Sequence, residues 1–281
     1  MEDTYQLLDA GGGRKLERFG DIVLDRPCAQ AVWRPELPSS EWRKADAVFH
    51  RSQHDSVWEC HHRLPTSWEC RLGGVSFLVQ PTDFGHIGMF PEHLRCWEKL
   101  RQLAADASEP LNVLNLFAYS GGATLVAASC GCKVCHLDAS KKMVEWARRN
   151  AALNQLENAP VRWLIDDVGK FLAREIRRGS QYDVVVLDPP SFGRGTNQEL
   201  FKIDDNMLTL LAQCRQVLKP DAKGLFLSCH TPGYTPIVLE NLLQQTLPPG
   251  RLEAGEMTIT ASTGTMLPSG AFACWTKLDN G

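Results

Sequence analysis

The sequence lacks four features, and each absence excludes a class of protein. No apolar run is long enough to span a membrane, and the acidic, polar start at residues 1–5 has no apolar signal core. Lys and Arg number 30 against 33 Asp and Glu, so the formal charge of −3 excludes a broad basic face. Repeats and low-complexity tracts are also missing. We therefore expect an unexported, cytoplasmic protein in which any contact with nucleic acid uses a local basic patch.

The composition leaves room for two cores. A chain of 281 residues with 43% hydrophobic content predicts about two domains, and ten cysteines in an unexported chain are expected to be reduced thiols. We place a β-rich module at residues 1–90, where Gly73 and Gly74 separate two strands as in a hairpin, and an α/β domain at residues 91–281. Four tryptophans are expected to fill the core of the module: Trp33, Trp42, Trp58 and Trp68. The alternative is that they form a surface on which bases stack.

Residues 111–122 organise the α/β domain. The apolar residues 111–117 run into a short turn with Gly121 and Gly122, and an Ala-rich segment follows. This pattern predicts a buried parallel strand, a tight loop and the start of a helix. Glycines in such a loop allow the backbone to approach a ligand, and a helix N-terminus adds oriented N–H groups. The alternative is a turn that only connects the strand to the helix.

Three further strands end in acidic side chains. The strands at residues 133–137, 161–165 and 182–187 are followed by Asp138, by Asp166 and Asp167, and by Asp188. The carboxyl ends of parallel strands share the edge of an open sheet where ligands bind, and an acid after the second strand suits a ribose diol. Three more strands are predicted at residues 224–229, 257–261 and 271–278, the last in an antiparallel pair. The domain therefore has an α/β fold with seven strands.

A dinucleotide-dependent oxidoreductase shares this strand pattern, but the sequence does not fit one. The fingerprint Gly-x-Gly-x-x-Gly is missing from residues 119–126. The loop Asp188-Pro189-Pro190 is rigid and exposes backbone carbonyls, which suits a planar amine or the edge of a base but has no role in hydride transfer. The alternative for this loop is a rigid turn whose Asp caps a helix.

Four motifs at these strand ends carry a family resemblance. They are residues 114–122, 138–140, 166–168 and 188–195, and the stretch from Tyr5, with residues 84–92, adds to them. The motifs resemble class I S-adenosylmethionine-dependent methyltransferases, most closely the subgroup that contains large-subunit rRNA cytosine-C5 methyltransferases. The resemblance implies a Rossmann-like seven-stranded methyltransferase sheet with a small N-terminal β-rich domain. It also implies S-adenosyl-L-methionine as the cofactor and RNA as the substrate, with cytosine C5 of rRNA as the position. The alternative is a methyltransferase that acts on an amino group or on a substrate other than RNA.

The resemblance also implies roles for individual residues. The backbone of residues 119–121 would line the methionine part of the cofactor, and residues 84–90 would lie over it. Asp138 would hold the ribose hydroxyls, and Asp167 with the Val168 N–H would bind adenine. The implied cofactor-binding residues are Asn115, Phe117, Ala118, Tyr119, Ser120, Gly121, Asp138, Ala139, Ser140, Asp167, Val168 and Asp188.

The sequence departs from the related motifs at Asn115, where an acidic residue is common. The side-chain oxygen of Asn can still accept a hydrogen bond from the methionine ammonium, but it lacks the charge that makes such a bond roughly twice as strong. Weak cofactor binding and a different role for Asn115 both stay open.

The catalytic residues are predicted to be Asp188 and Cys229. Methylation at pyrimidine C5 needs a nucleophile that adds to C6, and Cys229 ends the strand expected beside Asp188. The alternative is a buried structural cysteine, because cysteine is among the most buried residue types. Enzymes of this fold that methylate amino groups usually have an aromatic residue directly after the two prolines of the loop that begins at Asp188. This chain has Ser191 at that position and Phe192 one position later.

Three rival interpretations remain, and we predict no metal centre. The literal c-type haem motif is matched by Cys132, Cys135 and His136. These residues lie on a predicted strand, where the two cysteines, three positions apart, point to opposite faces, so they do not suit one haem. Zinc sets would be Cys130, Cys132 and Cys135, or Cys60, His62 and Cys70. A non-catalytic RNA-binding module would bind phosphates through a basic rim made of Arg174, Arg177, Arg178, Arg194 and Lys202. The alternative is that these side chains only form a solvated helix face.

Overall fold

The contacts of the chain divide it into two units. The computed structural model describes residues 2–51, 56–194 and 200–278. Unit 1 comprises Met1–Glu92 with Thr258–Ser269, and unit 2 comprises His93–Met257 with Gly270–Gly281. The predicted boundaries put residues 258–269 in the α/β domain, whereas this segment groups with unit 1. The division into domains at residues 1–90 and 91–281 stays a prediction.

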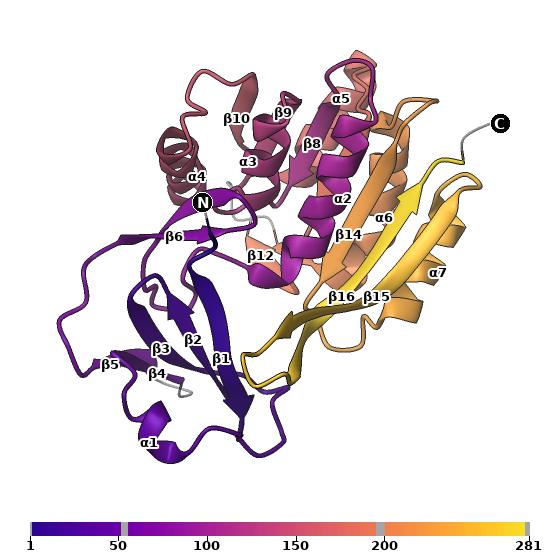
Figure 1. Cartoon of the computed structure of the whole chain (residues 1–281). Coiled ribbons are helices and arrows are strands. Elements are labelled where there is room, and N and C mark those ends of the chain that lie inside the picture. The colour runs from indigo at the N-terminus through magenta and orange to yellow at the C-terminus, as the bar shows by residue number, and fades with distance from the viewer. Residues whose placement is uncertain (1, 52–55, 195–199, 279–281) are drawn as a thin grey trace. The chain divides into compact units, whose positions relative to one another are not determined.

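Unit 1 is built from two small sheets (Figure 1). The five-stranded sheet has the order β1-β2-β3-β4-β5, with β1 Tyr5–Gly11, β2 Arg14–Phe19, β3 Ile22–Pro27, β4 Ala47–Arg51 and β5 Ser56–Cys60. The second sheet pairs β6 Trp68–Leu72 with β7 Val75–Val79, and the elements α1 Ser39–Trp42 and η1 Pro91–His93 are short. The hairpin predicted at Gly73 and Gly74 is confirmed, because Leu72 pairs with Val75 across it. Strands β4 and β5 were not predicted.

Residues 258–269 complete a small core in unit 1. Leu7 of β1 forms a parallel bridge with Ala261, and the Ser262 N–H donates to the Leu7 carbonyl at 2.8 Å. Leu7 is buried in one cluster with Ile259 and Leu267. This burial explains why the segment groups with unit 1 and not with the strands that flank it in the sequence.

The four tryptophans of unit 1 are half-buried, and their indole N–H groups all have acceptors within the unit. The acceptors are the carbonyls of Ala10, Thr82 and Phe19 for Trp33, Trp58 and Trp68, and the Asp9 carboxylate for Trp42. A buried indole normally finds a partner for its N–H in this way. The four side chains are therefore held to unit 1 but lie outside its fully buried core, and the choice between core bulk and a stacking surface stays a prediction.

Unit 2 contains the predicted seven-stranded sheet. Its order is β10-β9-β8-β11-β14-β16-β15, with β8 Asn112–Leu116, β9 Lys133–Asp138, β10 Val161–Ile165, β11 Val184–Leu187, β14 Gly224–Cys229, β15 Arg251–Thr260 and β16 Met266–Thr276. Strands β10, β9, β8, β11 and β14 pair in parallel, and β16 is antiparallel to β14. The predicted α/β fold with a late antiparallel strand is confirmed.

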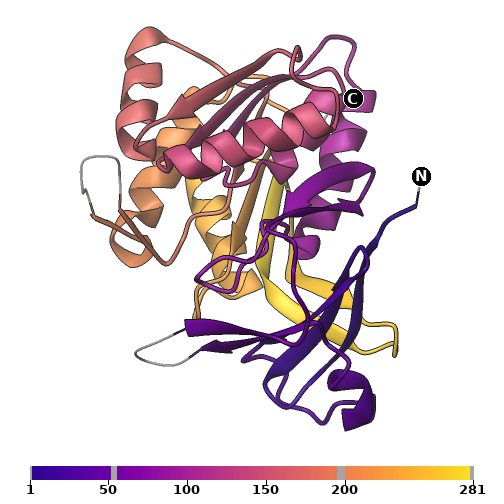
Figure 2. The same ribbon diagram turned by 90° about the vertical axis from the view of Figure 1, so that its left-hand side faces the viewer.

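Helices cover both faces of this sheet. In chain order they are α2 Leu94–Ala105, α3 Gly122–Ser129, α4 Lys141–Leu153, α5 Val168–Arg178, α6 Ile203–Val217 and α7 Pro236–Thr246. Figure 2 shows α2 (magenta) and α6 (orange) on opposite sides of the sheet. Between β11 and α6 lies a two-stranded ribbon of β12 Phe192–Arg194 and β13 Leu200–Lys202. None of the described helices has the length and apolar character needed to cross a bilayer.

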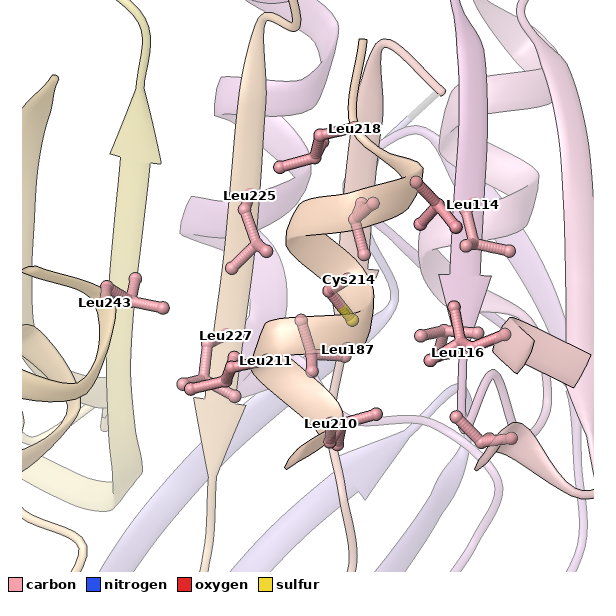
Figure 3. Close-up of a cluster of buried hydrophobic side chains, with 14 of the residues drawn as sticks. Leu114, Leu116, Leu187, Leu210, Leu211, Cys214, Leu218, Leu225, Leu227 and Leu243 are labelled. Atoms are coloured by element: carbon pink, nitrogen blue, oxygen red, sulfur yellow. The ribbon is translucent and has the colours of Figure 1, made fainter. Parts of the chain in front are cut away.

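One large core lies between the sheet and helices α5, α6 and α7. Helix α6 contributes Leu210, Leu211 and Cys214, whose spacing of one, three and four positions puts them on one face. Figure 3 shows these side chains against leucines of three strands, among them Leu116 and Leu187. The strands are mostly apolar because helices cover them on both sides. The acidic side chains Asp138 and Asp188 lie where β9 and β11 end.

The glycines after β8 provide space for neighbouring helices. Gly121 has a left-handed φ of 93°, and a Cβ atom there would lie 3.0 Å from Cβ of Ala147 on α4. A Cβ at Gly122 would lie 2.5 Å from a ring carbon of Trp97 on α2. Both positions therefore have a packing reason for glycine, which differs from the expected close approach to a ligand.

Replacing Gly122 by Ala should destabilise the protein by about 1–3 kcal/mol, because the added methyl overlaps Trp97 in a packed interior. Urea unfolding measures this change. Gly169→Ala in α5 is the matched control, since a Cβ there would come no closer than 3.4 Å to the Asp167 carboxylate. The control should be unchanged or up to about 1 kcal/mol more stable. Equal stabilities for the two variants would contradict the packing explanation.

Candidate cofactor and active site

The predicted site residues of unit 2 come from four neighbouring strands. The sheet order reverses between β8 and β11, and the crevice at such a point is where open α/β sheets bind ligands. Leu187, the last residue of β11, pairs with Leu116 of β8 on one side and with Leu227 of β14 on the other. Asp188 follows Leu187 and therefore lies at the end of the strand between β8 and β14. Asn115 lies on β8, Asp138 ends β9 and Cys229 ends β14.

The loop after β8 has a strained backbone that Asp138 holds in place. Phe117 and Tyr119 have positive φ values of 53° and 49°, which are uncommon outside glycine and cost of order 1–3 kcal/mol each. The Asp138 carboxylate accepts the Tyr119 N–H at 3.0 Å and the Ser140 N–H at 2.8 Å. Backbone strain of this kind clusters at ligand sites. Burial raises the pKa of Asp138, and the two N–H groups oppose that rise.

A chain of three buried polar side chains lies under this loop. Asn115 Nδ2 donates to Thr124 Oγ1 at 2.9 Å, and Thr124 Oγ1 is 2.9 Å from His136 Nδ1. The three side chains are at most 4% exposed. Because the amide nitrogen of Asn115 is used by Thr124, its carbonyl oxygen is the end available to another donor. Desolvation lowers the pKa of His136 to about 3, so this imidazole is neutral.

Asp167 begins helix α5. Its Oδ1 accepts the Lys170 N–H at 2.9 Å, which is an N-cap bond. Asp166 accepts the Asp167 N–H at 2.9 Å and forms an ion pair with Arg174. The second carboxylate oxygen of Asp167 is therefore the one available for a ligand, and its contact with adenine stays a prediction.

Asp188 is accompanied by two histidines that the sequence reasoning did not select. Its Oδ2 lies 3.3 Å from His93 Nε2 and 3.6 Å from His230 Nε2, whereas its Oδ1 is buried without a hydrogen-bond partner among the described residues. Burial alone would raise the pKa of Asp188, but the charge of His230 and hydrogen bonds from both imidazoles hold it well below the ordinary value. This carboxylate is therefore ionised at neutral pH.

His230 is exposed and Cys229 is buried. Strand alternation predicts that His230 faces away from the thiol, and its Nε2 lies 3.6 Å from Asp188 Oδ2. The signal that could have found it was a histidine directly after the strand beside β11. His93, which precedes α2, gave no such signal.

Cys229 lies in the core at 1% exposure. Burial raises the pKa of its thiol, and hydrogen bonds from the backbone and hydroxyl of Thr231 act in the other direction. Thr231 Oγ1 is also 2.6 Å from Ser191 Oγ, which connects the thiol to the loop after Asp188. The catalytic role of Cys229 stays a prediction.

The residues behind the rival interpretations do not form sites. Cys132, Cys135 and His136 are buried on β9 at 1%, 5% and 0% exposure, whereas haem attachment needs accessible thiols. Within the described ranges, neither proposed zinc set comes together at ligand spacing: Cys130, Cys132 and Cys135, or Cys60, His62 and Cys70. All ten cysteines are free, and Cys60 and Cys130 are the exposed ones.

The predicted basic rim is partly neutralised. Arg174 pairs with Asp166, and Arg178 with Glu175 at 3.0 Å, while Arg177 and Lys202 are exposed. The side chain of Arg194 and the rest of its loop, residues 195–199, lie outside the described residues. Residues 84–90 belong to unit 1, so their predicted place over the cofactor stays a prediction.

His136 should make the stability of the fold depend on pH. Its pKa is about 3 in the folded chain and ordinarily 6.5, so between these values the unfolded chain binds the extra proton and stability falls as the pH falls. From about pH 7 to about pH 5 this group alone should remove about 2 kcal/mol. Urea unfolding of wild type and His136→Gln at both pH values measures it. The variant should lose less stability over this interval, and equal losses would contradict the assignment.

Comparison with known proteins agrees with this geometry. Residues 23–247 match the S-adenosylmethionine-dependent methyltransferase family. The chain is 32% identical over 215 residues to the ribosomal RNA large subunit methyltransferase I of Aeromonas hydrophila, which covers 71% of this chain and 50% of that protein. It is 32% identical over 155 residues to the ribosomal RNA large subunit methyltransferase K/L of Vibrio cholerae, covering 54% and 21%. The chain thus spans half or less of the length of these relatives.

Solved structures show the same fold. The S-adenosylmethionine-dependent methyltransferase from Agrobacterium tumefaciens superposes with a TM-score of 0.94 at 40% identity, covering 99% of this chain and 91% of that one. The tRNA (uracil-54, C5)-methyltransferase of Pyrococcus abyssi has a TM-score of 0.54 at 14% identity, covering 96% and 63%, and shows the fold alone. The chain therefore belongs to the S-adenosylmethionine-dependent methyltransferase family, and it is an enzyme whose cofactor is S-adenosyl-L-methionine.

Proposed function

We propose that this enzyme methylates RNA, with large-subunit ribosomal RNA as the substrate class and cytosine C5 as the position. The observation that carries the substrate class is the similarity, over 71% of the chain, to a protein named ribosomal RNA large subunit methyltransferase I. The position rests on Asp188 and Cys229, which end neighbouring paired strands in unit 2.

The crevice beside the loop after β8 has the groups that the cofactor needs. The Asn115 carbonyl oxygen would accept from the methionine ammonium, since its amide nitrogen already donates to Thr124. Both oxygens of Asp138 hold backbone N–H groups, and each keeps a lone pair for a ribose hydroxyl. When bound, S-adenosylmethionine supplies an electrophilic methyl group on a positively charged sulfur.

Asp188 is suited to hold the base that is methylated. Its Oδ1 is buried and lacks a partner among the described residues, and a buried unpaired oxygen of this kind costs free energy until a donor reaches it. An amino group or protonated ring nitrogen of a base would be such a donor. Phe192, which follows two residues after Pro190, is 56% exposed and offers a ring for stacking.

The thiol of Cys229 would add to C6 of the cytosine, making C5 electron-rich enough to accept the methyl group. Thr231 supports this role, because its hydrogen bonds favour the thiolate against the effect of burial. Methylation of an amino group is the second candidate, and the burial of Cys229 at 1% exposure favours it. The two candidates differ in whether a covalent bond to the enzyme forms.

Replacing Asp138 by Asn should weaken the binding of S-adenosylmethionine roughly ten- to hundredfold, because hydrogen bonds to a charged group contribute about 1.5–3 kcal/mol. The near-isosteric Asn keeps the volume of the side chain beside Tyr119 and Ser140. Isothermal calorimetry gives the dissociation constant, and circular dichroism checks that the variant is folded. An unchanged affinity would overturn the ribose assignment, and no binding by the wild type would overturn the assignment of the pocket.

RNA that carries 5-fluorocytidine should trap a covalent complex with the wild-type enzyme and S-adenosylmethionine, because fluorine at C5 cannot leave as a proton does. Denaturing gel electrophoresis detects the complex. Cys229→Ala should abolish both trapping and turnover while it binds the cofactor normally. Cys130→Ala, which removes an exposed thiol of unit 2, is the control and should trap the RNA and turn over as the wild type does. If Cys229→Ala methylates RNA at the wild-type rate, Cys229 is structural and the amino-group candidate replaces the first.

A further inference from the structure

A carboxylate with two imidazoles lies at the strand ends of unit 2. Asp188 follows β11, His230 follows β14 and His93 precedes α2, so three separate elements bring them together. Both Nε2 atoms face Asp188 Oδ2, at 3.3 Å for His93 and 3.6 Å for His230. The two rings meet edge to face, with centroids 5.8 Å apart. The proposed function uses Asp188 of this cluster but neither histidine.

Methyl transfer to a carbon or nitrogen that carries hydrogen leaves a proton to be removed. The bond between the acceptor atom and the methyl carbon forms, the bond between that carbon and sulfur breaks, and its electron pair neutralises the sulfur. The hydrogen of the acceptor atom must then leave as a proton. A positioned base that takes it contributes about 10²–10⁴-fold to the rate, and histidine is the most common one.

We propose that His230 is the base that takes this proton and that Asp188 orients it. With Nε2 turned to the carboxylate, the hydrogen of the neutral ring lies on Nε2, and Nδ1 carries the lone pair. The proton moves from the acceptor atom to Nδ1, and the ionised carboxylate stabilises the imidazolium that forms. In nucleophilic catalysis in general, the base that activates the reacting group is itself oriented by a third side chain, which is the role of Asp188 here. The inference deepens the proposed function, but it needs only an acceptor atom that carries hydrogen.

Gly270 lies beside Nδ1 of His230. A Cβ atom at Gly270 would lie 3.0 Å from His230 Nδ1, and Gly270 has a φ of 113° that side chains rarely adopt. Glycine at position 270 therefore allows the backbone to pass close to the Nδ1 side of the ring without a clash. A side chain there would also meet the Cys229 carbonyl at 2.8 Å.

Exposure distinguishes the two histidines. The side chain of His230 is 40% exposed and can meet a substrate, whereas that of His93 is 14% exposed. His93 is therefore a positioning residue, which contacts the same Asp188 oxygen, Oδ2, as His230 does. The other titratable groups near the cluster are Cys96 on α2, Cys229 at the end of β14 and Asp204 on α6. Burial raises the pKa of both thiols, and hydrogen bonds from Thr231 oppose that rise at Cys229.

The first experiment measures methyl transfer from tritiated S-adenosylmethionine to total RNA from cells that lack this enzyme. His230→Gln should lower kcat about 100-fold or more while the affinity for the cofactor stays within about twofold, and added imidazole should restore part of the rate to His230→Ala. The wild-type rate should fall toward low pH, and this dependence should be lost in His230→Gln. His62→Gln, an exposed histidine of unit 1, should match the wild type.

A kcat of His230→Gln within about threefold of the wild type would overturn the proposal. The proposal would also be overturned if exhaustive chelation abolished the wild-type activity and zinc restored it, because Asp188, His93 and His230 would then hold a cation.

The second experiment needs no substrate. Nitrogen-15 NMR of histidine-labelled protein, with His230 assigned through the His230→Gln variant, should show hydrogen on Nε2, and Asp188→Asn should alter this spectrum. Hydrogen on Nδ1 would overturn the proposal. If the wild type methylates no RNA, the proposed function fails, and the NMR result still decides whether His230 is oriented as a base.

Discussion

The parallel pairing of β8 with β9 on one side and β11 on the other is the constraint on which the site depends. These central strands are buried on both faces, so their acidic side chains lie where the strands end, and the polar Asn115 and His136 inside the sheet have a buried partner in Thr124. The strand order reverses between β8 and β11, and ligands of open α/β sheets bind at the carboxyl edge of such a point. Asp138 and Asp188 therefore face the same region although 50 positions separate them (188 − 138).

The buried polar groups of unit 2 support the loop that lines the crevice. Asp138 holds the backbone at Tyr119, and the chain from Asn115 through Thr124 to His136 runs beneath it. A buried polar chain of this kind specifies one arrangement, because each member is costly without its partner. The neutral His136 fits this structural role, whereas His230 is exposed and keeps its ring accessible.

The sequence alone was sufficient for the main sheet, because apolar runs that end in Asp138, Asp167 and Asp188 show both the strands and their shared edge. Strands β4 and β5 were missed because their pattern is short and partly exposed. The long strand β15 begins six positions before its predicted start (257 − 251), and its last residues group with unit 1. The contact of His93 with Asp188 joins positions 95 residues apart (188 − 93), and no local periodicity encodes such a contact. The packing role of Gly122 likewise depends on where α2 passes.

The distribution of the thiols has a practical consequence. Seven of the ten cysteines are buried and one is half-buried, while Cys60 in unit 1 and Cys130 in unit 2 are exposed. Maleimide dyes react with accessible thiols, so the natural chain carries one attachment point for a fluorophore in each unit. Energy transfer between a donor and an acceptor dye at these two positions would report the separation of the units in solution, and its change when cofactor or RNA is added, without the introduction of a new cysteine.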